Sequence, residues 1–172
     1  MALLHGWRYC PRCKGELAHR NGAAACGACG FVAYANSAPT TNALVEDGEG
    51  RILLARRGIE PDMGKWDVIG GFLDEYEHPL DGLRREVREE TGLEVEPGEF
   101  VCATVDWYGD GPDAVATLNL TWTARILSGE PAPEDDVAEL RWFAPDELPH
   151  PDELAFRRIS EVLAAWRSLR AE

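Results

Sequence analysis

Three glutamates, Glu86, Glu89 and Glu90, follow the spacing i, i+3 and i+4, which predicts that they share one face of a helix. Carboxylates crowded on one face repel one another, so we expect a cation between them. Carboxylate oxygens are the ligands that hard divalent cations prefer. The spacing therefore predicts a site for a hard divalent cation.

The angular positions divide the three glutamates. At about 100° per residue, Glu90 lies about 40° and Glu89 about −60° from Glu86. Leu83 and Val87 fall at about 60° and 100°, on the apolar stripe that faces the core. We therefore expect Glu86 and Glu90 to share a metal at the edge of a cleft. Glu89 is either a further ligand or a base toward water.

The residues before this helix add a loop. Gly70 and Gly71 follow the apolar pair Val68–Ile69, which predicts a strand that ends in a loop whose backbone can approach a ligand closely. Glu77 precedes the helix proper, and its expected partner is Arg85, which would pin the loop to the helix.

The expected helix has clear boundaries. Pro79 suits a first-turn position, and Gly92 suits the left-handed cap that follows Thr91. We therefore expect a helix from about Pro79 to Thr91, with Glu77 in the loop before it.

The combined pattern resembles the complete box of the Nudix hydrolase family: Gly71-x5-Glu77-x7-Arg85-Glu86-Val87-x-Glu89-Glu90-x-Gly92-Leu93. A solvated, salt-bridged helix would explain the glutamates, but not the fixed positions of Gly71 and Glu77. The resemblance covers about residues 38–150. It implies an α/β fold, an α/β/α sandwich with a mixed sheet.

The resemblance also implies an activity. Nudix hydrolases cleave the pyrophosphate bond of a nucleoside diphosphate linked to another moiety, with Mg²⁺ or Mn²⁺ and with water attacking phosphorus. The implied metal ligands are Glu86, Glu89, Glu90 and a backbone carbonyl of Gly70 or Gly71. The general base varies within the family. Here we consider Glu89 and an acid of the loop 130–136, and we favour Glu134; alternatively, that loop is only a solvated acidic segment.

Four of the five cysteines form two Cys-x2-Cys pairs with the spacing of a tetrahedral zinc site: Cys10, Cys13, Cys26 and Cys29. Gly15 and Gly30 are the small residues that such turns need. Four thiolates leave no open position, so Zn²⁺ would be structural, and disulfide or redox pairs are the weaker alternative. The fifth, Cys102, lies in an apolar stretch and fits a small core residue better than a nucleophile.

The remaining chain divides into recognisable segments. We expect a four-cysteine zinc ribbon in residues 1–35 and a Nudix hydrolase domain in residues 36–172. Hydrophobic runs and turn signals predict strands at 40–45, 51–56, 65–69, 99–108, 116–127 and 139–143. A second helix is expected over 151–170.

Four further residues are candidates for substrate binding. Arg56 and Arg57 follow a strand and could clamp phosphate, or they could simply end a surface strand. Trp107 and Tyr108 close a strand near the expected cleft. They could stack on a base or a nicotinamide, or they could serve only in packing.

Composition limits the classes of partner. A hydrophobic content of 45% over 172 residues supports a real core, and a formal net charge of −14 makes broad nucleic-acid binding unlikely. No apolar run has the length of a membrane span, and the first residues do not form a signal peptide, so we expect a cytoplasmic protein. A homodimer is compatible with the sequence.

The substrate is less constrained. A zinc ribbon before a Nudix box is similar to the NADH pyrophosphatases, but their Ser-Gln-Pro-Trp-Pro-Phe-Pro run is absent at 102–109. ADP-ribose hydrolases tend to have a proline at the position of Gly109. We rank ADP-ribose or a related nucleotide sugar first, NADH second and a mutagenic nucleoside triphosphate third. A nucleotide sensor and an RNA 5′-end processing module, with the locally basic ribbon holding RNA, are the alternatives.

Overall fold

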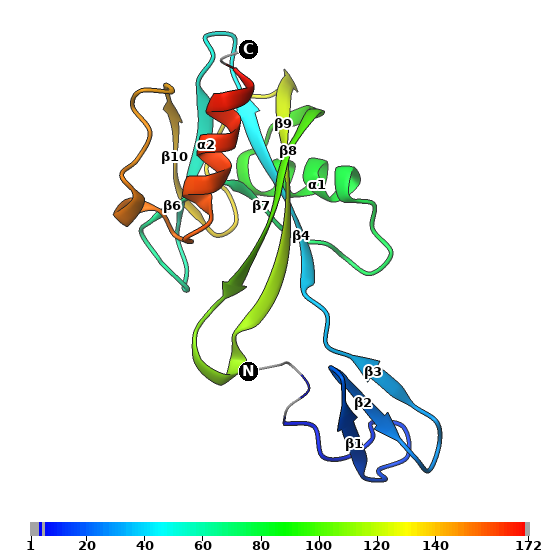
Figure 1. Ribbon diagram of the computed structural model, residues 1–172. Helices are drawn as coiled ribbons and strands as arrows, with labels where there is room; N and C mark the ends of the chain where they lie inside the picture. Colours follow the sequence, from blue (N-terminus) through cyan, green and yellow to red (C-terminus); the bar gives the residue numbers. More distant parts are fainter. Residues whose placement is uncertain (1–3, 5, 171–172) are drawn as a thin grey trace.

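A seven-stranded mixed sheet forms the centre of the computed structural model, which describes Leu4 and residues 6–170. Its strands are β4 (Ala38–Glu46), β5 (Ile52–Arg57), β6 (Trp66–Asp67), β7 (Ile69–Phe72), β8 (Glu94–Tyr108), β9 (Val115–Ser128) and β10 (Val137–Phe143). The helices are α1 (Pro79–Thr91) and α2 (Ile159–Leu169), with 3-10 turns at Gly111–Asp113 and Pro151–Glu153. A smaller sheet, β1 (Leu17–Arg20), β2 (Ala23–Cys26) and β3 (Val32–Tyr34), lies beyond the start of β4 (Figure 1).

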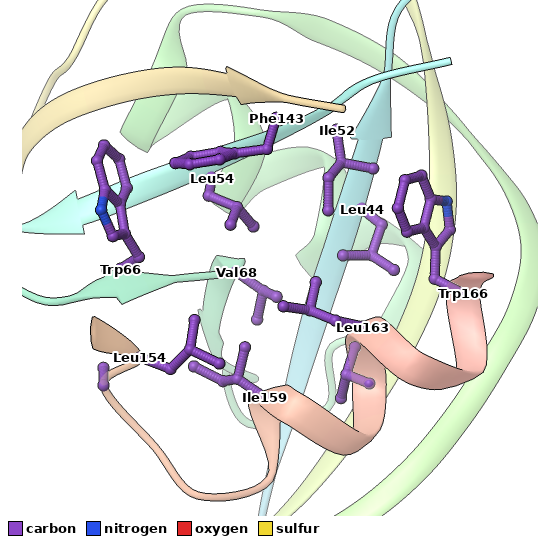
Figure 2. Close-up of a cluster of buried hydrophobic side chains, with 12 residues drawn as sticks. Leu44, Ile52, Leu54, Trp66, Val68, Phe143, Leu154, Ile159, Leu163 and Trp166 are labelled. Carbon is purple, nitrogen blue, oxygen red and sulfur yellow. The ribbon is translucent and has the colours of Figure 1, made fainter. Parts of the chain in front are cut away.

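The alternation of side chains along β4 and β5 creates two cores, one on each face of the large sheet. On one face, Leu44 and Leu54 pack against α2 through Leu163 and Trp166 (Figure 2). On the other face, Val45, Leu53 and their neighbours pack against Leu83 and Val87 of α1. The helices therefore cover opposite faces, and the predicted α/β/α sandwich is confirmed.

Strand pairing places Gly70 and Gly71 of β7 beside β4, in the middle of the sheet. β4 pairs with β9 in parallel and with β7 in antiparallel register, so Gly70 lies opposite Asn42 and Gly71 opposite Thr41. The remaining pairs of the sheet are antiparallel. Helix α1 begins and ends as predicted: Pro79 is its first residue, and Gly92 has a φ of 70° and donates its N–H to Arg88 O.

Two predicted elements differ from the structure. The expected strand at 65–69 is two short strands, β6 and β7, interrupted at Val68, where the chain moves from pairing with β5 to pairing with β4. The expected helix over 151–170 contains only α2 at its C-terminal end. Residues 154–158, which we name the strap, follow a 3-10 turn and precede α2.

The strap is not helical because its backbone binds other elements. Leu154 forms a parallel bridge with Trp66, and the Ala155 N–H donates to the Trp66 carbonyl oxygen at 2.9 Å. The Arg158 N–H donates to Asp106 Oδ2 at 3.3 Å. These tertiary hydrogen bonds replace those that a helix would make here, and helical periodicity in the sequence cannot reveal them.

Trp166 anchors α2 to the sheet. Its side chain is fully buried, and its Nε1 donates to Glu46 Oε1 at 2.6 Å. Trp166→Ala should lower the free energy of unfolding by about 3–5 kcal/mol, because it leaves a large cavity in the core. Urea denaturation followed by circular dichroism measures this loss. Leu169→Ala, on the exposed side of α2, is the matched control and should cost less than about 1 kcal/mol; equal losses would contradict this role for Trp166.

Candidate active site

A pocket of about 390 Å³ opens where β7, α1 and the ends of β5 and β8 meet. Carboxylates from separate parts of the chain line it, among them Asp67, Glu86, Glu90 and Asp136. Arg57 and the backbone of Gly70 and Gly71 also line it. The pocket therefore combines a concentrated negative charge with exposed backbone and a guanidinium group.

The two glycines of β7 touch the helical glutamates. The Gly70 N–H donates to Glu90 Oε2 at 3.1 Å. A Cβ on Gly71 would lie 2.6 Å from Glu86 Oε1, so a side chain there would displace that carboxylate. The predicted arrangement, with Glu86 and Glu90 at the edge of a cleft beside the glycine loop, is present in the structure.

Burial dominates the electrostatics of this pocket. It raises the pKa of Glu90 to about 9, and the neighbouring charges of Asp136 and Glu86 act in the same direction. Burial also raises the pKa of Asp67 to about 6, although Arg57 Nη1 donates to Asp67 Oδ2 at 3.1 Å. Several carboxylates thus line one pocket, and the nearby guanidinium groups of Arg57 and Arg85 pair with Asp67 and Glu86. This set of oxygen donors fits a hard divalent cation.

Arg85 fastens the loop before α1 to the helix, as predicted. Its Nε and Nη2 donate to the two carboxylate oxygens of Glu77 at 2.9 and 2.8 Å, and Nη2 also donates to the Phe72 carbonyl oxygen. The hydrogen bonds from Arg85 lower the pKa of Glu77 to about 2. Arg85 Nη1 also donates to Glu86 and to Glu89.

Glu89 differs in position from the other two glutamates. Its side chain is half exposed and contacts Arg85, whereas the Glu86 side chain is only 13% exposed. Glu86 and Glu90 line the pocket, and Glu89 is not among the lining residues. The angular analysis therefore placed the three glutamates correctly relative to Arg85 and the core.

The predicted substrate-binding residues separate in space. Arg57 lines the pocket, but Arg56 points away from it: its Nε donates to Gly64 O at 2.7 Å, and its Nη1 pairs with Glu139 at 3.3 Å. Trp107 and Tyr108 both line the pocket. Tyr108 also contacts Phe72 edge to face, with ring centroids 5.3 Å apart.

The acidic loop before β10 contributes a different acid from the expected one. Glu134 is exposed, and an added Cβ on Gly92 would lie 3.5 Å from its Oε1, at the C-terminal end of α1. Asp135 and Asp136 line the pocket instead. The Gly58 N–H donates to the Asp136 carbonyl oxygen at 2.6 Å, which holds this end of the loop against β5.

Sequence reasoning did not single out Asp67, Phe72 or Asp136. Phe72 follows the glycine pair directly, and Asp136 directly precedes β10, so their positions beside predicted elements were the available signals. The choice among three consecutive acids depends on the conformation of the loop, which the sequence does not specify.

The four cysteines of the ribbon converge. Their Sγ atoms all lie within 4.8 Å of one another, with Cys10–Cys29 at 3.6 Å and Cys13–Cys26 at 3.5 Å. Tetrahedral zinc with Zn–S bonds of about 2.3 Å separates its sulfur atoms by about 3.8 Å. All five cysteines are free, so the cluster can hold a metal and contains no disulfide. The fifth, Cys102, packs beside the α2 core, as expected of a core residue.

The two cysteine turns are built alike. Lys14 N–H donates to Cys10 O, and Gly30 N–H donates to Cys26 O. Both donors have a left-handed φ, 65° for Lys14 and 73° for Gly30. In the first turn the left-handed residue is thus Lys14, and the Gly15 that follows it lies where an added Cβ would be 3.4 Å from Cys13 Sγ.

The fold and the pocket define a Nudix protein, and comparison with known sequences agrees. The NUDIX domain model matches residues 36–165. The chain therefore belongs to the Nudix family.

Relatives of the chain include two proteins of similar sequence and one of similar structure. The chain is 32% identical over 146 residues to the NAD-capped RNA hydrolase NudC of Vibrio vulnificus, covering 83% of this chain and 52% of that protein. It is also 32% identical over 147 residues to the human mitochondrial NAD(P)H pyrophosphatase NUDT13, covering 82% of this chain and 40% of that protein. The chain thus spans about half of the length of such relatives. The crystal structure of a NUDIX hydrolase from Nitrosomonas europaea superposes with a TM-score of 0.77 at 26% identity, covering 95% of this chain and 92% of that one.

Within the part of the chain that the structure describes, no helix is long and apolar enough to cross a membrane.

The Glu77–Arg85 pair should make stability depend on pH. The folded state lowers the pKa of Glu77 from 4.5 to about 2, so its stabilisation is complete above about pH 4.5 and is lost as the pH falls through about 2. Glu77→Gln should lower the free energy of unfolding by about 1–2 kcal/mol at pH 7 and by less at pH 3. Urea denaturation at both pH values measures the difference. Glu75→Gln, in the same loop, is the control, and an effect of Glu77→Gln that does not change with pH would argue against the ion pair.

Proposed function

We propose that the protein is a metal-dependent hydrolase that cleaves the pyrophosphate bond of a nucleoside diphosphate linked to another moiety. The observation that carries this proposal is the convergence of Glu86 and Glu90 on the backbone of Gly70 and Gly71 within one pocket. A protein that only senses a nucleotide needs no such set of buried carboxylates, so the sensor alternative is the weaker one.

The metal ligands in this proposal are Glu86, Glu90 and a backbone carbonyl of Gly70 or Gly71. Mg²⁺ or Mn²⁺ bound there would neutralise the diphosphate and lower the pKa of a bound water. Glu89 was expected to be a metal ligand or the base. Its carboxylate instead accepts a hydrogen bond from Arg85, so in this proposal Glu89 helps to position Arg85.

Asp136 is our proposed general base, in place of Glu134. It lines the same pocket as Glu90, and its negative charge contributes to the raised pKa of Glu90, which supports a position near that carboxylate. A carboxylate in this position can accept a proton from the attacking water. Arg57 lines the same pocket and can orient the diphosphate. Arg56 points away and is not part of this assignment.

The substrate proposed first is now a dinucleotide of the NADH type, with ADP-ribose or a related nucleotide sugar second. The relatives named NAD-capped RNA hydrolase and NAD(P)H pyrophosphatase support this order. Tyr108 and Phe72 provide an aromatic wall on which a base can stack. The name of the Vibrio relative also supports a second candidate function, removal of an NAD cap from RNA.

We also propose that the four-cysteine cluster holds one structural Zn²⁺ and that residues 1–35 and 36–172 form separate units. The spacing of the sulfur atoms supports the first part. The second part is supported by the separate small sheet of β1 to β3.

Substitutions in the pocket test the catalytic assignment. Glu90→Gln should lower kcat/KM for NADH by more than about 100-fold at saturating Mg²⁺, because it removes a metal ligand. Asp136→Asn should lower kcat by about 100-fold or more if Asp136 is the base. Phosphate released by a coupled phosphatase measures both rates.

Glu134→Gln is the matched control, because Glu134 belongs to the same loop but lies outside the pocket lining. Its activity should stay within about threefold of the unsubstituted protein. Circular dichroism checks that each variant is folded. Near-normal turnover of Glu90→Gln would contradict the metal assignment, and a larger loss for Glu134→Gln than for Asp136→Asn would return the base to Glu134.

Zinc content tests the ribbon. Mass spectrometry of metals should find one zinc per chain, and Cys26→Ser should lose most of it, because three thiolates bind zinc more weakly than four. Cys102→Ser should keep its zinc. A purified protein without zinc, in which all five thiols react at once, would contradict the structural site.

A further inference from the structure

A second pocket, of about 650 Å³, adjoins the proposed active site. The two pockets share the side chains of Asp106, Trp107 and Phe156. Asp106 and Trp107 lie near the end of β8, and Phe156 belongs to the strap. The cleft therefore continues past the carboxylates of the first pocket, and the strap and the end of β8 divide it into two compartments.

The dividing wall is held firmly in place. Asp106 accepts hydrogen bonds from the backbone N–H groups of Trp107 at 2.9 Å and Arg158 at 3.3 Å. Phe156 packs on Tyr108, with ring centroids 5.8 Å apart, and on the guanidinium group of Arg57. The separation of the two compartments is thus built by contacts between elements that are distant in the sequence.

The charge of the second pocket determines what it can accept. Carboxylates outnumber cationic groups among its lining residues: Asp62, Asp106, Asp110 and Asp152 against Lys65 and Arg157. Lys65 and Asp62 form an ion pair at 2.8 Å, which leaves Asp106, Asp110 and Asp152 against Arg157. Such a pocket repels a phosphate group, whereas carboxylates accept hydrogen bonds readily from ribose hydroxyls.

The shared wall also offers a surface for a base. The Trp107 side chain is 49% exposed although it lines both pockets. An exposed indole provides a flat apolar face, and stacking of a base on an aromatic side chain is worth about 1–3 kcal/mol. The chemistry on this side of the wall therefore fits an uncharged nucleoside.

We propose that the second pocket binds the second nucleoside of a substrate in which a diphosphate joins two nucleosides, an inference that rests on the hydrolase function proposed above. The diphosphate and the first nucleoside occupy the pocket of Glu86 and Glu90. The second base stacks on Trp107, and its ribose faces the carboxylates. The pocket favours a terminal nucleoside over a nucleotide that continues into a further phosphate.

Diadenosine diphosphate is the test substrate, because its two ends are identical and either end presents adenosine to the second pocket. ADP-ribose, which has one nucleoside, is the reference. Trp107→Ala should lower the ratio of the two kcat/KM values by about tenfold, and Trp107→Phe should recover most of that ratio. Tyr34→Ala, an exposed aromatic residue of the ribbon, is the control and should not change the ratio. An unchanged ratio in Trp107→Ala would overturn the proposal.

A second test addresses charge. Asp110 and Asp152 are exposed and line only the second pocket. The unsubstituted protein should discriminate against an analogue of diadenosine diphosphate with a 3′-phosphate on each ribose. The double variant Asp110→Asn, Asp152→Asn should reduce this discrimination about threefold to tenfold. A discrimination that is absent, or unchanged in the variant, would contradict the proposal.

Binding separates a failure of this inference from a failure of the hydrolase function. Calorimetric titration with diadenosine diphosphate and Mg²⁺ gives a Kd without requiring turnover. Binding that weakens about tenfold in Trp107→Ala, without hydrolysis by the unsubstituted protein, would refute the hydrolase and retain the pocket. Hydrolysis with a Kd that Trp107→Ala leaves unchanged would retain the hydrolase and refute the pocket.

Discussion

The close approach of β7 to β4 is the constraint on which the site depends. A Cβ on Gly70 would lie 2.1 Å from the Thr41 carbonyl oxygen, and Gly70 has a φ of 145°, so only glycine can stand there. At Gly71, next to it, an added Cβ would meet the Glu86 carboxylate at 2.6 Å, so a side chain there would displace that carboxylate. Because β7 pairs with β4 in this way, its backbone meets the carboxylates of α1 within the pocket.

Burial of these carboxylates is electrostatically unfavourable, because their charged forms are withdrawn from water. Glu90 holds a pKa of about 9 because it is withdrawn from water among other carboxylates. Arg57 and Arg85 offset part of the negative charge, but each is already engaged, with Asp67 and with Glu77. The fold thus keeps an electrostatically unfavourable cluster intact by surrounding it with strongly paired residues, and the two hydrophobic cores supply stability on either side of the sheet.

The parts of the protein that depend on local patterns could be predicted from the sequence. Helix α1, its C-terminal cap at Gly92, the Glu77–Arg85 pair and the positions of Glu86 and Glu90 all follow from spacing along one helix and its loop. The parts that depend on contacts between distant segments could not. The selection of Asp136 over Glu134 requires the loop conformation fixed by Gly58, and the non-helical strap requires the backbone of Trp66 and Asp106 as partners.

The strap has a consequence for how this fold can diversify. It is a single stretch of chain between a 3-10 turn and α2, and its hydrogen bonds to β6 and β8 use backbone groups of its own. Its path therefore depends on these backbone hydrogen bonds and on the packing of Leu154, Ala155 and Phe156. Insertions or deletions between residues 154 and 158 could merge, enlarge or close the two compartments while leaving the carboxylates untouched. Chain length in this one segment offers a route to new substrate ranges that does not disturb the catalytic chemistry.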